Sequence, residues 1–217
     1  MSRSSQVEIE RKYDVATMIE IPDLVGAGTI AVVEAVEIID LDAVYYDTDE
    51  FQLAANRVAL RRREGGSDAG WHIKIKQPEA EGRTELHWPI GQRAGTGEVD
   101  AVPAELQAEV EALTAGHPLR AVARITNRRE NRRLLDAAGY PVAELSDDHV
   151  HAENLITAAT REWREWEVEL LAAAPDTRAK RAALLGEIEA ILLSSGAVVS
   201  PSSSKLARAL GVDEATS

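Results

Sequence analysis

The sequence contains no cysteine, so disulfide bonds, zinc–thiolate sites and cysteine nucleophiles are excluded. It also lacks an excess of positive charge: 24 Lys and Arg stand against 37 Asp and Glu, which gives a net charge of −13. General nucleic-acid binders and proteins of anionic membranes usually carry a basic surface, so we expect neither class of partner. No apolar run approaches the roughly 20 residues of a membrane helix. The first residues, MSRSS, have no apolar segment typical of a secretory signal, so we expect a cytoplasmic protein.

What is present suffices for a folded core. The 217 residues are 45% hydrophobic, which predicts a single domain over residues 1–217 with flexible ends at 1–5 and 212–217. Asp14 is a plausible N-cap for a short helix that ends near Pro22. The remaining pattern is an antiparallel α+β one. It has strands within 6–13, 29–48, 57–63, 71–77, 83–90, 119–136, 140–146 and 162–171, a loop at 91–102, and helices at 103–114 and 176–195.

Charged residues recur at every second position in five candidate strands. Side chains of a strand alternate between its two faces, so residues two apart share a face. In residues 6–13, Glu8, Glu10 and Lys12 therefore lie on one face. The other charged faces are formed by Arg61 and Arg63; by His72, Lys74 and Lys76; by Arg83, Glu85 and His87; and by Glu165, Glu167 and Glu169.

These faces are sorted by sign. A half-buried sheet often exposes a polar face, and for any one strand that explanation is adequate. Across neighbouring strands, however, like charges are unfavourable unless a ligand of opposite charge lies between them. An anion would stabilise the basic faces and a divalent cation the acidic ones, so a metal–polyphosphate complex would satisfy both. If the strands close into a barrel, the charged faces line its interior, and Trp71, Trp88 and Trp166 point outward beneath the helices.

The ordered motifs resemble those of one known family. Glu8-Ile9-Glu10-Arg11-Lys12 has the ExExK pattern of the CYTH superfamily, also called triphosphate tunnel metalloenzymes. The resemblance extends over about residues 6–210 and implies an eight-stranded antiparallel β-barrel that forms a tunnel, with helices packed outside. The other matching segments are Tyr45-Tyr46-Asp47-Thr48, Leu60-Arg61-Arg62-Arg63, Ile73-Lys74-Ile75-Lys76, Arg83-Thr84-Glu85, Glu165-Trp166-Glu167-Val168-Glu169-Leu170 and Ser204-Lys205-Leu206.

The resemblance also implies a chemistry. Members of this family bind triphosphate groups with Mg²⁺ or Mn²⁺, and their activities include hydrolysis of inorganic, thiamine, nucleoside and RNA triphosphates and cyclisation of ATP. We expect a metal-dependent triphosphatase that acts on a small triphosphate-containing molecule, foremost inorganic triphosphate. An adenylate cyclase of the same fold and a non-catalytic polyphosphate-binding module are the alternatives. Relatives are often dimers, so a homodimer is a further expectation.

Residue roles follow from the matched motifs. A one-residue slip exchanges the two faces of a strand, so Arg128 and Arg129 are both candidates, as are Asp147 and Asp148, with Asp148 preferred. His87 stands where the family often has an acid, and we expect it to have no catalytic task. The candidate ligands are all carboxylates, which suits Mg²⁺ or Mn²⁺. The expected phosphate-binding residues are Lys12, Arg61, Arg63, Lys74, Lys76, Arg128 or Arg129, and Lys205; the metal ligands Glu8, Glu10, Asp148, Glu167 and Glu169; and the catalytic residues Glu10, Glu85 and Lys12.

Overall fold

The structure, a computed structural model, describes residues 3–77, 80–90 and 101–212. Of the expected flexible ends, residues 1–2 and 213–217 lie outside the described residues, as does most of the expected loop at 91–102. The strands are β1 (Ser4–Glu8), β2 (Glu10–Asp14), β3 (Val32–Val33), β4 (Glu37–Asp47), β5 (Val58–Glu64), β6 (Gly70–Lys76), β7 (Arg83–Pro89), β8 (Arg120–Leu135), β9 (Pro141–Asn154), β10 (Thr160–Leu170) and β11 (Val198–Val199). The helices are α1 (Gln52–Ala55), α2 (Ala104–Thr114), α3 (Arg178–Ser194) and α4 (Lys205–Leu210).

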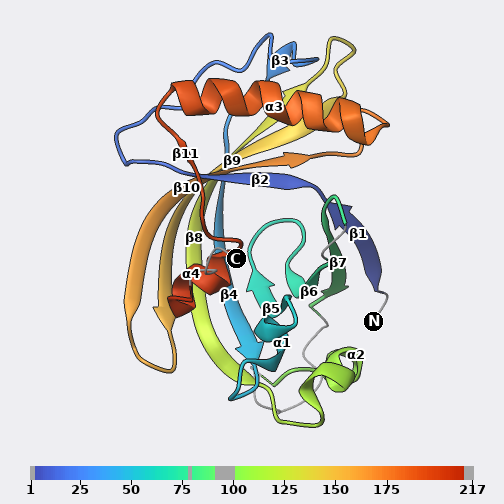
Figure 1. Cartoon of the computed structure of the whole chain (residues 1–217), viewed down its shortest axis with the longest axis vertical. Coiled ribbons are helices and arrows are strands. Elements are labelled where there is room, and N and C mark those ends of the chain that lie inside the picture. The colour runs from blue at the N-terminus through green and yellow to red at the C-terminus, as the bar shows by residue number, and fades with distance from the viewer. Residues whose placement is uncertain (1–2, 78–79, 91–100, 213–217) are drawn as a thin grey trace.

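The strands form one antiparallel sheet that curls into a barrel (Figure 1). Its order is β1-β7-β6-β5-β4-β8-β9-β10-β2-β11. Strands β1 and β2 are separated only by Ile9, yet β1 pairs with β7 and β2 pairs with β10. This first segment therefore bridges the two ends of the sheet. Counted once, it makes eight barrel strands with β4 to β10 among the described residues, so the expected fold class is confirmed.

The helices α1, α2 and α3 cover the outside of the barrel. Apolar residues of α3 recur at helical spacing, and Leu184 and Ile188 pack against Tyr13 and Trp166 of the sheet. The side chain of Thr177 accepts a hydrogen bond from the Lys180 amide and caps this helix. A second core joins α1 and α2 to β5–β7; it contains Leu53, Leu60, Trp71, Trp88, Leu106 and Val110. The expected outward packing of the tryptophans is confirmed.

Helix α4 differs from the expectation that the helices pack outside. Leu206 and Ala209 of α4 pack in a third cluster with Ala43, Tyr45 and Ile125. All three of these sheet residues line the interior of the barrel, so α4 covers inward-facing residues. The sequence SKLARAL explains this position, because its short helix has an apolar face with Lys205 beside it.

The segment after Asp14 contains no helix, so that expectation is wrong. Asp14 ends β2 and pairs with Arg208, and no residue of 15–31 is helical. The guanidinium of Arg164 instead donates hydrogen bonds to the backbone oxygens of Ala16, Thr17 and Ile19 (2.7–3.1 Å). A long-range contact therefore replaces the local hydrogen bonds that a helix would make. Within the described ranges, no helix is both long and apolar enough to cross a membrane.

Candidate active site

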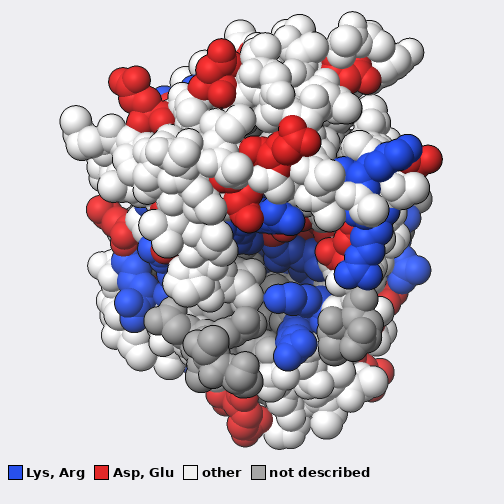
Figure 2. All heavy atoms as spheres, turned by 45° about the horizontal axis from the view of Figure 1, so that its top comes forward, with Lys and Arg blue, Asp and Glu red and all other residues white. Residues whose placement is uncertain are grey.

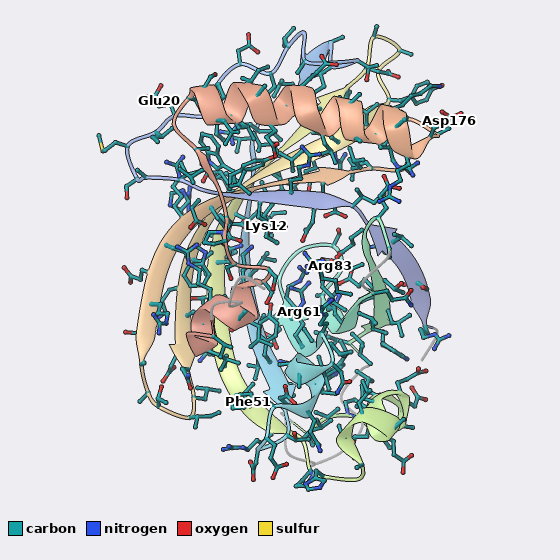
Figure 3. The ribbon with its side chains drawn as sticks, in the orientation of Figure 1. Lys12, Glu20, Phe51, Arg61, Arg83 and Asp176 are labelled. Carbon is teal, nitrogen blue, oxygen red and sulfur yellow. The ribbon has the colours of Figure 1, made fainter. Side chains whose placement is uncertain are left out.

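The interior of the barrel holds a cavity of about 790 Å³ whose lining is rich in charged side chains. Figure 2 shows Lys and Arg side chains gathered inside a hollow of the molecule. Figure 3 places Lys12, Arg61 and Arg83 between the strands in the middle of the barrel. These charges come from strands far apart in the sequence, because every inner face of a closed barrel points to the same space.

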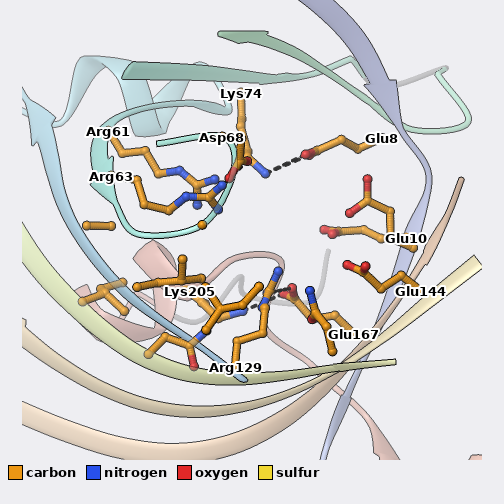
Figure 4. A pocket seen from close by; sticks show the side chains of 18 of the residues that line it. Glu8, Glu10, Arg61, Arg63, Asp68, Lys74, Arg129, Glu144, Glu167 and Lys205 are labelled. Carbon is orange, nitrogen blue, oxygen red and sulfur yellow. Dashed lines mark hydrogen bonds and ion pairs between the residues drawn. The ribbon is translucent and has the colours of Figure 1, made fainter. Parts of the chain in front are cut away.

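One wall of the cavity is basic. Arg61 and Arg63 of β5 and Lys74 of β6 project into the cavity from neighbouring strands (Figure 4). The guanidinium of Arg61 donates to the Tyr45 hydroxyl at 3.3 Å. Burial and the neighbouring Arg61 lower the pKa of the Arg63 guanidinium. Within the described part of the chain, the buried Nε atoms of Arg61 and Arg63 have no hydrogen-bond partner, so this wall has donors to spare.

Opposite lies a buried acidic cluster, defined here as Asp148, Glu165 and Glu167, of which Glu167 lines the cavity and the other two lie buried behind it. Each offers a carboxylate oxygen, and these oxygens lie within 4.8 Å of one another. The Lys205 ammonium lies 2.5–2.8 Å from all three carboxylates. The Arg129 guanidinium donates to both oxygens of Asp148 (2.7 and 2.6 Å) and to Glu167 (2.6 Å). The cluster is therefore neutralised by cations of β8 and α4.

The ion pairs of the acidic cluster set the pKa values of its carboxyl groups. Burial alone would raise the pKa of Glu167, but the ammonium groups of Lys12 and Lys205 hold it well below its ordinary value. Burial likewise opposes ionisation of Asp148, yet Arg129 and Lys205 lower the pKa of its carboxyl group to about 2. Both groups are therefore carboxylates at neutral pH, which is the protonation state a metal ligand needs.

Glu8 and Glu10 lie between the two walls. Lys74 donates to both oxygens of Glu8 (2.9 and 2.8 Å), and Arg83 forms an ion pair with Glu10. Both carboxylates line the cavity, as the ExExK pattern predicts. The first strand thus connects the acidic cluster, through Lys12, with the basic wall, through Lys74.

A row of further carboxylates extends across β2, β10 and β9. Glu169 pairs in register with Glu10 on one side and with Glu144 on the other. Among the described residues, no cation lies within ion-pair distance of Glu169 or Glu144. Burial and the nearby Glu8 raise the pKa of Glu169 to about 7, and burial raises the pKa of Glu144. Like charges in adjacent strand positions are unfavourable without a counter-ion, so this row could also accept a cation.

Glu85, one of the predicted catalytic residues, does not line the main cavity. It is buried behind the basic wall, where it lies 2.8 Å from His72 Nδ1 and 3.4 Å from Lys74 Nζ. His87 stacks on His72 at a centroid distance of 4.8 Å. Burial lowers the pKa of His72 to about 4, so the ring is neutral at pH 7. The structure thus places Glu85 where it can position Arg61 and Lys74 and not where it can touch a ligand in the cavity.

The two pairs of alternative residues are resolved by register. Arg129 pairs with Asp148 across β8 and β9, and both face the interior. Arg128 instead pairs with Glu130 on the outer face, and Asp147 pairs with Arg164. Lys76 is exposed and lines an adjoining cavity of about 390 Å³. The main cavity brings together Lys12, Arg61, Arg63, Lys74, Arg129 and Lys205 with Glu8, Glu10, Glu167 and Glu169.

Several residues of the site were not predicted from the sequence. Tyr45 and Asp68 line the cavity, and Glu144, Asn131 and Arg133 extend the inner faces of β9 and β8. The two-residue alternation from Arg129 and from Asp148 would have found the last three once those registers were known. Asp68 lies on a loop, so no periodic pattern points to it.

The donor set fits a hard divalent cation. All candidate ligand atoms are carboxylate oxygens, which Mg²⁺ and Mn²⁺ prefer. Asp148, Glu165 and Glu167 already bring three such oxygens together, and Glu8 of β1 and Glu10 of β2 line the same cavity as Glu167. Lys12 and Lys205 now neutralise the cluster, so a bound cation would take over part of their role.

Comparison with known proteins identifies the family. Residues 6–199 match the CYTH domain. The uncharacterized protein Rv2226 of Mycobacterium tuberculosis (strain H37Rv) is 39% identical over 215 residues, which cover 94% of this chain and 40% of that protein. The uncharacterized protein MT2285 of strain CDC 1551 matches equally. The chain therefore spans about 40% of the length of these curated relatives.

Solved structures share the fold. A putative adenylate cyclase from Bacillus halodurans superposes with a TM-score of 0.56 at 20% identity, covering 94% of this chain and 97% of that one. The PH1819 protein of Pyrococcus horikoshii OT3 gives 0.50 at 16% identity, covering 88% and 92%. These superpositions show the shared architecture, and the match over residues 6–199 establishes the family. The chain belongs to the CYTH domain family.

Proposed function

We propose that this chain is a metal-dependent triphosphatase that hydrolyses the terminal phosphoanhydride bond of inorganic triphosphate. One observation carries the proposal: a cavity of about 790 Å³ is lined on one side by two guanidinium groups whose Nε atoms have no partner among the described residues, and on the other by Glu167 of the acidic cluster. A short polyphosphate with its divalent cation matches both walls. This match also resolves the conflict between a net charge of −13 and an anionic ligand, because eight of the 24 Lys and Arg residues line this one cavity.

The basic side chains would bind the phosphate chain from two sides. Arg61 and Arg63 can each hold phosphate oxygens in a bidentate manner, whereas Lys74 acts as a point charge. On the other side, Lys205 and Arg129 now contact carboxylates and can turn part of their hydrogen-bonding capacity toward phosphate. Phosphoryl transfer depends mainly on such positioning and charge stabilisation.

The metal-side residues of this proposal are Glu8, Glu10, Asp148, Glu167 and Glu169, with Glu165 added by the structure. A bound Mg²⁺ or Mn²⁺ would supply charge neutralisation on the phosphate oxygens. The Lys12 ammonium contacts both Glu10 and Glu167 in the free protein. Ligand binding would therefore exchange internal ion pairs for ammonium–phosphate and carboxylate–metal contacts. Such an exchange keeps Lys12, Glu10 and Glu167 paired before and after binding.

Orientation of the attacking water falls to Glu10 in this proposal. Its carboxylate borders the cavity beside Lys12, within the ring of cations that would hold the terminal phosphate. Glu85 serves as a positioning residue, because it lies behind the wall in contact with His72, Lys74 and Arg61. It would fix two phosphate-binding side chains, Arg61 and Lys74, from the side away from the cavity.

The two other functions make different demands on the cavity. An adenylate cyclase needs a purine pocket, and among the described residues Tyr45 is the only aromatic side chain of the cavity lining. A plain polyphosphate-binding module needs no acidic cluster. No observation therefore favours either function over hydrolysis.

The test is an assay of the purified chain with inorganic triphosphate, thiamine triphosphate and ATP, each with Mg²⁺ or Mn²⁺. We expect orthophosphate release from inorganic triphosphate and none after Glu167→Gln. Glu162→Gln is the matched control, since Glu162 lies on the same strand but is exposed and forms its ion pair with His151. Cyclic AMP from ATP would show a cyclase, and tight binding without turnover would show a binding module; either result would overturn the proposal.

A further inference from the structure

Asp68 places a carboxylate inside the basic wall. It lies on the loop between β5 and β6, and its carboxylate forms an ion pair and a hydrogen bond with the Arg63 guanidinium (Figure 4). Among the described residues, Asp68 is the carboxylate that forms an ion pair with Arg63. Burial alone would raise the pKa of Asp68, but Arg63 and His72 lower it, so the group is charged at neutral pH.

The backbone of this loop is held in place. The backbone oxygen of Asp68 lies 3.0 Å from His72 Nε2, and His72 is itself completely buried. Gly65 adopts φ = 81°, and a Cβ at this position would lie 2.0 Å from the Asp40 backbone oxygen. Glycine is therefore needed where the loop turns back toward the cavity. The loop presents Asp68 to the cavity from a fixed position.

The side chain, in contrast, is free to move. The Asp68 side chain is 50% exposed, whereas that of its partner Arg63 is only 10% exposed. Rotation about the side-chain torsions can release the carboxylate into the open cavity without any change in the backbone. Arg63 would then offer the donors that now contact Asp68, together with its unpartnered Nε, to an incoming anion.

We propose that Asp68 is an internal counter-anion that a phosphate group must displace from Arg63, and that it thereby weakens the binding of every anion that uses Arg63. The inference rests on the proposed function, because it concerns the same cavity. Displacement costs the same free energy for every ligand, so it raises the dissociation constants of triphosphate and orthophosphate by the same factor. A triphosphate contacts several cations and stays bound despite this cost, whereas orthophosphate, with few contacts, binds weakly. Asp68 thus favours release of the short product of the reaction.

The test compares dissociation constants for inorganic triphosphate and for orthophosphate, measured by calorimetry in EDTA so that neither metal nor turnover contributes. We expect Asp68→Asn and Asp68→Ala to tighten binding of both anions by roughly fivefold, the size of a partly exposed ion pair. Glu64→Gln is the matched control, because it removes one negative charge near the same loop while its contact is Arg62. It should change either constant by less than about twofold.

The gain must depend on Arg63. In an Arg63→Met background, Asp68→Asn should leave the dissociation constants unchanged, a dependence that a general change in loop structure would not show. Two results would overturn the inference and leave the proposed function standing, provided that the unmodified chain binds triphosphate. The first is no gain in affinity in either Asp68 variant. The second is a gain in affinity that persists without Arg63. Absence of triphosphate binding in EDTA, with orthophosphate still released in Mg²⁺, would also overturn the inference alone, whereas absence of both binding and release in Mg²⁺ would contradict the proposed function.

Discussion

The two walls of the cavity differ in how far their charges are satisfied. Every carboxylate of the acidic cluster contacts a cation from another element: Lys12 from β2, Arg129 from β8 or Lys205 from α4. The guanidinium groups of the basic wall keep buried Nε atoms without a partner among the described residues. One wall is therefore complete in the free protein, and the other is not.

This difference separates architecture from recognition. A buried charge that loses its partner is strongly destabilising, so the paired wall holds β2, β8, β10 and α4 in one arrangement. An unsatisfied donor costs free energy in the free protein and gives it back when an anion binds. Removing a residue from the paired wall should therefore reduce stability, and removing one from the basic wall should reduce affinity.

The largest expected effect is on the paired wall. Arg129→Met removes the bidentate partner of Asp148, whose side chain is completely buried, and should lower the free energy of unfolding by about 3 kcal/mol. Arg128→Met is the matched control one position away, because Arg128 is exposed and pairs with Glu130. It should change stability by less than about 0.5 kcal/mol. Urea denaturation measures the stability of both variants. Equal stabilities would show that the ion pairs of the acidic cluster do not stabilise the fold.

Glu169, which has no ion-pair partner among the described residues, should make stability depend on pH. Glu169 has a pKa of about 7 in the folded chain, above the ordinary value of 4.5, so the folded state binds more protons between these values. Its stabilising contribution is present below pH 4.5 and is lost as the pH rises through 7. Glu169→Gln should therefore exceed the unmodified chain in stability by about 2 kcal/mol at pH 8 and match it at pH 5. Parallel pH profiles of the two proteins in urea denaturation would contradict this assignment.

The basic wall should respond in affinity instead. Arg61→Met should weaken inorganic triphosphate binding by about tenfold, the value of one hydrogen bond to a charged group, and change stability by less than about 1 kcal/mol. Arg62→Met is the matched control, because Arg62 is the next residue, lies on the outer face and pairs with Glu64. It should leave affinity unchanged. Calorimetric titration measures the affinity, and urea denaturation measures the stability. A loss of stability without a loss of affinity would show that Arg61 stabilises the fold and does not bind the ligand.

The smallest expected effect separates the two lysines of β6. Lys74 lines the main cavity and contacts Glu8, whereas Lys76 is exposed at the adjoining cavity. Lys76→Met should weaken triphosphate binding by less than about twofold, since exposed charges are largely screened. Lys74→Met should weaken it several times more in the same titration. The reverse order would move the phosphate site toward the adjoining cavity.

Much of this arrangement could be predicted from residue spacing. The two-residue alternation placed Glu8 with Glu10 and Lys12, and Arg61 with Arg63, on shared faces, and all five line the cavity. The α+β class and the long helix at 176–195 followed from the same kind of pattern. The short helix after Asp14 did not form, and Arg164 of the neighbouring strand β10, far away in the sequence, binds that backbone instead.

Other features depended on contacts between distant segments. Spacing alone treats both faces of a strand alike, so Arg128 and Arg129 became distinguishable only through pairing with β9. Glu85 shares a face with cavity residues, yet the packing of His72 and His87 sets it behind the wall.

By itself, the sequence determined which residues share a face and that the candidate ligands are oxygen donors suited to a hard cation. These properties are local, since they depend on a two-residue repeat and on side-chain chemistry. The tertiary structure alone decided which charges are already paired, that α4 closes on inward-facing residues, and that Asp68 contacts Arg63. Those properties depend on distances between segments far apart in the chain, and a net charge of −13 contains no information about them.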